Sequence, residues 1–144
     1  MHGIIDNLEI RYVGALVTAG SSIDNNSTRI DMQGYESVAF VTTITDSVAT
    51  GVAAMVIQQN TADSDTGMAA VTGTTATATC ATNDDLNGLT LITEVFKPTQ
   101  RYVQATRTSA TANIAYGEVY AILKPYRVPV TQHSTNADSA YVAN

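Results

Sequence analysis

The chain has 144 residues, which fits one domain built around one hydrophobic core. Charged residues make up only 14% of it, 44% are hydrophobic and 22 are threonine, a composition typical of a β-rich protein because threonine packs well on a pleated sheet. The net charge of −6 argues against nucleic acid as the main partner, and no apolar stretch approaches the roughly 20 residues of a membrane helix.

The first part of the chain predicts strands separated by turns. Alternating apolar and charged side chains indicate a strand that begins at Leu8, and the polar residues 24–27 favour a turn. Later segments that are apolar on both faces are typical of strands inside a sandwich. The predicted strands here are 8–17, 28–32, 35–44 and 52–59.

Residues 61–88 contain a polar loop, an alanine- and threonine-rich run and a closing Asn-Gly turn. Small side chains pack only where another backbone comes close. This segment is predicted to be either a pair of short strands at a subunit contact or an ordered loop. Within it lies the single cysteine, Cys80, which excludes an internal disulfide and is expected to be a buried small apolar residue.

The remainder predicts three further strands, two of which end at prolines because proline cannot continue a central strand. The whole pattern indicates a single all-β domain, an antiparallel β-sandwich or barrel of jelly-roll type, with at most one short helix. The core is expected over about 8–125, with an N-terminal arm, 1–7, and a polar C-terminal arm, 126–144, held in place by neighbouring subunits. The predicted strands are 89–96, 101–107 and 114–124.

Charge is unevenly distributed along the chain. Residues 1–96 carry two basic and eleven acidic side chains, a net −9, whereas residues 97–127 carry five basic side chains and only Glu118, a net +4. A positive region on an acidic protein suits docking against carboxylates. A solvated edge strand that uses charge to block aggregation is an equally good interpretation. The candidate partner-binding residues are Arg101, Arg107, Lys124, Tyr126 and Arg127.

Residues suited to catalysis or metal binding are few. His2 and His133 both lie in the expected arms, where no packed neighbours would hold a general base or a zinc ligand. The acidic turn at 63–67 lacks the glutamate that would complete a calcium loop, because Thr74 stands at that position. We therefore expect no enzyme, no cofactor and no metal site.

Tyr116 and Tyr120 are predicted to point the same way on one strand. An exposed pair of this kind would form a stacking platform for sugars or bases, as in a carbohydrate-binding tail adhesin. We favour the other interpretation, an edge of the core or of an interface with hydroxyl groups that reach partners.

Three segments carry a likeness to a known family: Asp31-Met32-Gln33-Gly34-Tyr35-Glu36-Ser37-Val38, Gln100-Arg101-Tyr102-Val103-Gln104-Ala105 and Tyr120-Ala121-Ile122-Leu123-Lys124-Pro125. They resemble small virion proteins of tailed bacteriophages, and among these most of all the capsid decoration, or cement, proteins. The resemblance implies a structural protein of the virion, assembled in the host cytoplasm, that binds itself, as a trimer, and the major capsid protein. A neck or tail protein is the alternative, and neither a membrane nor nucleic acid is an expected partner.

Overall fold

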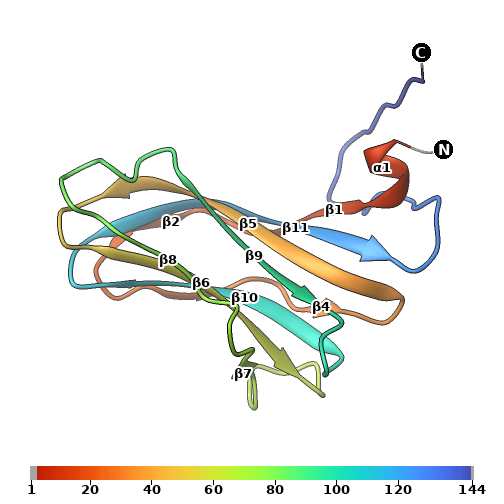
Figure 1. Ribbon diagram of the computed structural model, residues 1–144, viewed down its shortest axis with the longest axis horizontal. Coiled ribbons are helices and arrows are strands. Elements are labelled where there is room, and N and C mark those ends of the chain that lie inside the picture. The colour runs from red at the N-terminus through yellow and green to blue at the C-terminus, as the bar shows by residue number, and fades with distance from the viewer. Residues whose placement is uncertain (1–2, 144) are drawn as a thin grey trace.

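The computed structural model describes residues 3–143, which form two antiparallel sheets packed face to face (Figure 1). A single turn of helix, α1 (Ile4–Asn7), precedes them. The first sheet contains β1 (Glu9–Gly14), β2 (Val17–Gly20), β5 (Tyr35–Ser47), β9 (Thr90–Phe96) and β11 (Ile114–Pro125). The second sheet contains β3 (Asp24–Asn26), β4 (Ile30–Asp31), β6 (Val52–Asn60), β7 (Ala69–Ala70), β8 (Ala76–Thr79) and β10 (Tyr102–Ala110).

The predicted all-β sandwich is confirmed, whereas its jelly-roll type stays a prediction. Several boundaries differ from those expected. The first predicted strand is divided into β1 and β2, and the predicted turn at 24–27 contains the short strand β3, which pairs with β10. Of the two alternatives for residues 61–88, short strands are present: β7 and β8 both pair with β6. Among the described residues, no helix is long and apolar enough to span a membrane.

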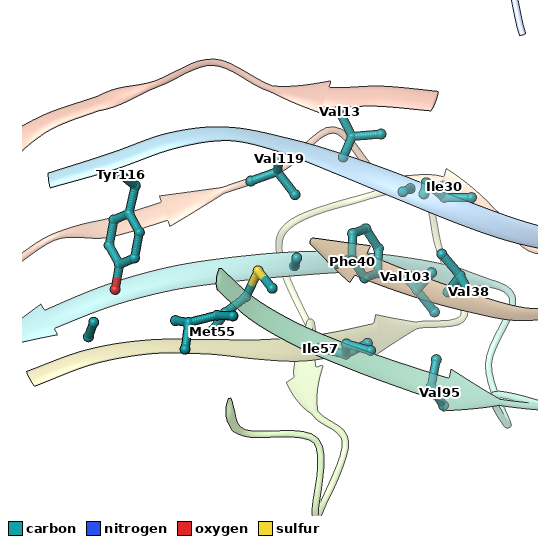
Figure 2. Packing of buried hydrophobic residues seen from close by; sticks show 14 of the residues in the cluster. Val13, Ile30, Val38, Phe40, Met55, Ile57, Val95, Val103, Tyr116 and Val119 are labelled. Atoms are coloured by element: carbon teal, nitrogen blue, oxygen red, sulfur yellow. The ribbon is translucent and has the colours of Figure 1, made fainter. Parts of the chain in front are cut away.

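The core lies between the two sheets, where alternate residues of the long strands point inward (Figure 2). Val38 and Phe40 of β5 are fully buried there, as are Met55 and Ile57 of β6. Cys80 is also buried, as predicted, and burial raises the pKa of its thiol. Because side chains alternate along a strand, this packing fixes which residues of every strand face solvent.

A β-bulge in β11 interrupts this alternation. Tyr116 lies opposite Ile44 of β5 and Val119 lies opposite Thr42, so that β11 has one more residue than β5 between the two pairs. The hydroxyl group of Thr42 donates to the carbonyl oxygens of Gly117 and Glu118, at 3.2 and 3.1 Å. The extra residue reverses which face the rest of β11 presents.

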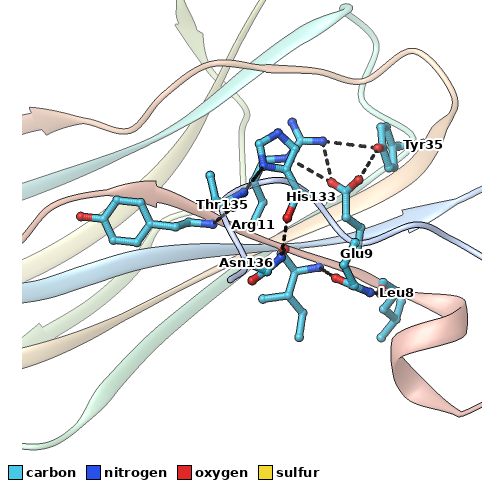
Figure 3. Close-up of polar contacts among 10 residues, drawn as sticks. Leu8, Glu9, Arg11, Tyr35, His133, Thr135 and Asn136 are labelled. Atoms are coloured by element: carbon cyan, nitrogen blue, oxygen red, sulfur yellow. Dashed lines mark hydrogen bonds and ion pairs between the residues drawn. The ribbon is translucent and has the colours of Figure 1, made fainter. Parts of the chain in front are cut away.

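The C-terminal arm covers the open edge of β1 (Figure 3). The side-chain amide of Gln132 accepts a hydrogen bond from the Ile10 amide at 2.9 Å and donates one to the Leu8 carbonyl at 2.7 Å. Thr135 accepts from the Tyr12 amide, and Asn136 donates to the Ile10 carbonyl. The expectation that neighbouring subunits order this arm is therefore wrong as far as Asn136, because its polar side chains dock on their own chain.

Candidate partner-binding site

An open cleft of about 500 Å³ lies at the end of the sandwich where β4, β9 and β11 finish and β10 begins. We call it the end cleft. Its walls come from the turn between β4 and β5, the turn between β9 and β10, and the residue that follows β11. The lining residues are Met32, Gln33, Tyr35, Lys97, Pro98, Thr99, Gln100, Arg101 and Tyr126.

Backbone hydrogen bonds hold the turns of the end cleft in place. Gly34 has a φ of +89°, which glycine adopts without strain, and its carbonyl accepts from the Tyr126 amide at 3.0 Å. Lys97 also has a positive φ, and its amide donates to the Glu36 carbonyl at 2.8 Å. The side chain of Gln59 accepts from the amides of Thr99 and Gln100. These contacts give the cleft a fixed shape.

Arg101 lies in the end cleft but is already paired. Its Nε and Nη2 atoms contact the two carboxylate oxygens of Asp31 at 2.9 and 2.8 Å, and Nη2 also donates to Gln33 at 2.7 Å. The hydrogen bond from Arg101 lowers the pKa of Asp31. A bidentate pair of this kind orients the guanidinium group and cancels most of its charge.

Lys124 and Glu36 form a second ion pair beside the cleft, with Nζ and Oε2 2.8 Å apart. The hydrogen bond from Lys124 lowers the pKa of Glu36, and the same contact raises the pKa of Lys124. The charge of Lys124 is therefore also compensated within the chain.

Two cations at this end form no ion pair within residues 3–143, although Lys97, after Lys124, helps to lower the pKa of Glu36. Within residues 3–143, no carboxylate lies within ion-pair distance of Lys97 or Arg127. The Lys97 ammonium lies 5.2 Å from the centre of the Phe96 ring, and the neighbouring Tyr126 is largely exposed. An exposed tyrosine near two cations that form no ion pair can bind a polypeptide that carries carboxylates.

Arg107 does not belong to this surface, and its assignment to an exposed positive region is wrong. It shares one face of β10 with Val103 and Ala105, as expected, but that face points into the core and leaves Arg107 1% exposed. Its guanidinium group donates to the carbonyls of Gly117 and Ala15 and to Oδ1 of Asn25. Burial lowers the pKa of Arg107.

Tyr116 and Tyr120 do not point the same way, so that the prediction of one shared face is wrong and the less favoured stacking platform is absent; Tyr116 fits the favoured interpretation of a core residue. The bulge in β11 turns Tyr116 into the core, 1% exposed, while Tyr120 faces solvent. The Tyr116 hydroxyl donates to the Thr108 carbonyl at 2.6 Å and accepts from the Ala54 amide at 2.9 Å. Tyr120 instead contacts Tyr12 edge to face, with ring centres 5.7 Å apart.

The remaining reactive residue types are widely separated. In the part of the chain that the structure describes, no three histidine, cysteine or acidic side chains come close enough to hold a metal ion. His133 lies in the C-terminal arm, where its Nδ1 contacts Thr135 at 3.0 Å, and His2 lies outside the described residues.

Of the five candidate residues, the structure brings Arg101 and Tyr126 into the cleft and places Lys124 and Arg127 at the same end. Lys97 was missed as a candidate, although it was counted in the positive region. Its signal was the sequence Phe96-Lys97-Pro98, because a lysine between a strand end and a proline lies in a turn.

No protein-family model matches this chain, and the search of curated proteins found no match. The likeness to phage virion proteins therefore rests on the residue patterns alone.

Proposed function

We propose that this protein is a non-enzymatic structural component of a phage virion, which binds the capsid as a decoration protein. In this proposal the end cleft docks on an acidic surface of the major capsid protein. Copies of the chain also bind one another, so that several weak contacts with the shell act together.

The observation that carries the proposal is the pair of cations that form no ion pair within residues 3–143, Lys97 and Arg127, near Tyr126 on a protein of net charge −6. The other charges of this end are neutralised by partners within the chain, so that these two are free to meet carboxylates of another protein. Charge complementarity of this kind directs the orientation of docking and raises the association rate.

Charge reversal at the cleft tests the docking surface. The wild-type protein should co-sediment with capsids of the parent phage, and the double variant Lys97→Glu/Arg127→Glu should bind at least tenfold less tightly. The control is Arg29→Glu, because Arg29 lies between β3 and β4, outside the cleft, and pairs with Asp63 and Asp65. Equal loss of binding in the control would show that overall charge, and not the cleft, determines affinity.

The end of the C-terminal arm provides a second test. The last residues of the arm run past α1 towards the chain end (Figure 1). Val142 is exposed, and the Tyr141 ring lies against Gly3. Removal of residues 137–144 keeps the part that docks on β1. It should lower capsid occupancy without changing the melting temperature. Unchanged capsid occupancy would show that residues 137–144 do not contribute to capsid binding.

A neck or tail protein is the alternative placement, and it would use the same end cleft on a different acidic partner. The carbohydrate-binding alternative required Tyr116 and Tyr120 to form one exposed stacking surface. That surface is absent, because Tyr116 is in the core. A glycan array that detects saturable binding would restore it through Tyr120 and Tyr12.

A further inference from the structure

Strand β9 forms an open edge of the first sheet. It pairs only with β5, and the Lys97 amide and the Leu89 carbonyl both bond to that strand. In an antiparallel ladder such bonds recur at every second residue, so that odd-numbered residues of β9 face β5. The backbone groups of Thr90, Ile92, Glu94 and Phe96 consequently point outward and have no partner among the described residues.

The outward side chains of β9 include two large apolar ones, Ile92 at 61% exposure and Phe96 at 60%. Ile92 continues an apolar row that crosses the whole outer face of the sheet through Val41, Tyr120 and Tyr12. Soluble proteins usually protect such an edge with lysine, proline or a bulge. Glu94 is the only charged residue within β9.

An open groove of about 320 Å³ runs beside the middle of this edge. It is bounded by residues 92–94 on one side and by residues 73–76, which precede and begin β8, on the other. Figure 1 looks on to this side of the sandwich, with β9 in front. The groove provides room for the side chains of an added strand. The unpaired backbone amides and carbonyls lie in a row along β9. A partner that bonds to them must therefore present an extended strand.

The remaining edges favour a second copy of β9 as the occupant. At the other side of the first sheet, the C-terminal arm of the same chain covers β1, and β2 has only four residues. The edge strands of the second sheet have only two to four residues, against seven in β9. One open edge cannot support head-to-tail growth, so that pairing of β9 with itself gives a closed two-fold dimer.

Charge selects the register of such a pair. A two-fold axis at Glu94 places two carboxylates directly opposite, and an axis at Thr93 or Val95 leaves them diagonal neighbours. An axis at Ile92 places Ile92 opposite its own copy and Glu94 opposite Thr90. In that register the two Glu94 residues are about 14 Å apart along the strands.

We infer that two copies of this protein pair through β9, antiparallel and with Ile92 opposite Ile92, to form one continuous sheet. The inference goes beyond the proposed function and does not depend on it, because the pairing involves neither the end cleft nor a capsid. It assigns an even-numbered assembly in place of the trimer that the phage resemblance implies.

Mass measurement of the purified protein in solution tests the pairing. Sedimentation equilibrium should give a concentration-dependent dimer. Ile92→Lys should shift the protein to monomer with little change in melting temperature, because the side chain is exposed in the monomer. A trimer, a monomer at high concentration, or a dimer unaffected by Ile92→Lys would overturn the inference.

Cross-linking tests the register and is independent of any effect on folding. Ile92→Cys places two thiols on α-carbons about 5.5 Å apart, inside the range of a disulfide, whereas Glu94→Cys separates them far beyond it. Under mild oxidation Ile92→Cys should give a covalent dimer, while Glu94→Cys and the wild-type protein, whose Cys80 is buried, should not. Cross-linking of Glu94→Cys in preference to Ile92→Cys would contradict the proposed register.

Discussion

Arg107 of β10 donates a hydrogen bond across the sandwich to the carbonyl oxygen of Gly117, inside the bulge of β11. The same guanidinium group bonds to Ala15, where β1 gives way to β2, and to Asn25 of β3. One buried side chain therefore fixes three irregular points of the backbone. Within the described residues it has no carboxylate partner, so that carbonyl dipoles and one amide stabilise its charge.

We predict that Arg107→Ala lowers the free energy of unfolding by about 3–5 kcal/mol, because it leaves a cavity and removes the donor to several buried acceptors. Arg107→Met should cost less, since methionine fills most of the volume and carries no charge. Urea denaturation measures both. Arg101→Ala, directly before β10, is the control, and its exposed ion pair should contribute little. Equal effects of Arg107→Ala and Arg101→Ala would contradict this account.

We predict that the free energy of unfolding falls in alkali because of the buried phenol of Tyr116. Burial raises the pKa of its phenol to about 12, whereas an unfolded tyrosine ionises near about 10. The folded state therefore retains a proton that the unfolded state releases. The resulting stabilisation is complete below about pH 10 and is lost as the pH rises towards about 12.

The Tyr116→Phe variant provides the measurement. At neutral pH it should be less stable by about 1–3 kcal/mol, because the Thr108 carbonyl and the Ala54 amide lose their partner. Between pH 10 and 12 its stability should decline less steeply than that of the wild-type protein. If the stability of the wild-type protein and of Tyr116→Phe declined equally with pH, groups other than Tyr116 would cause the loss in alkali.

The C-terminal arm should protect the edge of β1 from exchange with solvent. The double variant Gln132→Ala/Asn136→Ala removes the side chains that bond to the backbone of Ile10. Hydrogen exchange at the amides of Ile10 and Tyr12 should become faster, and the uncovered edge should promote aggregation. Ser134→Ala, on the exposed side of the arm, serves as the control and should leave both amides protected.

Cys80 should be inert in the folded protein. It is 1% exposed, and burial raises the pKa of its thiol, so that little thiolate is present at neutral pH. Iodoacetamide should modify it only after unfolding in denaturant, as followed by mass spectrometry. Rapid modification of the native protein would indicate that the 80–88 turn opens readily.

The sequence predicts correctly those strands in which apolar and polar side chains alternate. Val38, Phe40 and Ile44 share the buried face of β5, as their spacing predicts, and the prolines mark strand ends. Short strands such as β3 were missed because Asp24-Asn25-Asn26 has the composition of a turn. Its strand geometry comes from pairing with β10, which local sequence does not encode.

The candidate site was harder to predict because polarity alone does not indicate which face of a strand is buried. Arg107 was assigned to the surface, since arginine is rarely buried without a partner. Tyr116 and Tyr120 were assigned to one face, because a bulge at Gly117 and Glu118 cannot be inferred from spacing. The pairing of Arg101 with Asp31, seventy residues apart, likewise depends on the tertiary fold.

The claim that this chain is a capsid component is tested most directly by counting its copies in purified particles of the parent phage, with quantitative mass spectrometry against the major capsid protein. A decoration protein should be present in numbers comparable with the shell subunits and should be lost in the Lys97→Glu/Arg127→Glu variant. Absence from the particle, or the few copies of a single ring, would contradict placement on the capsid.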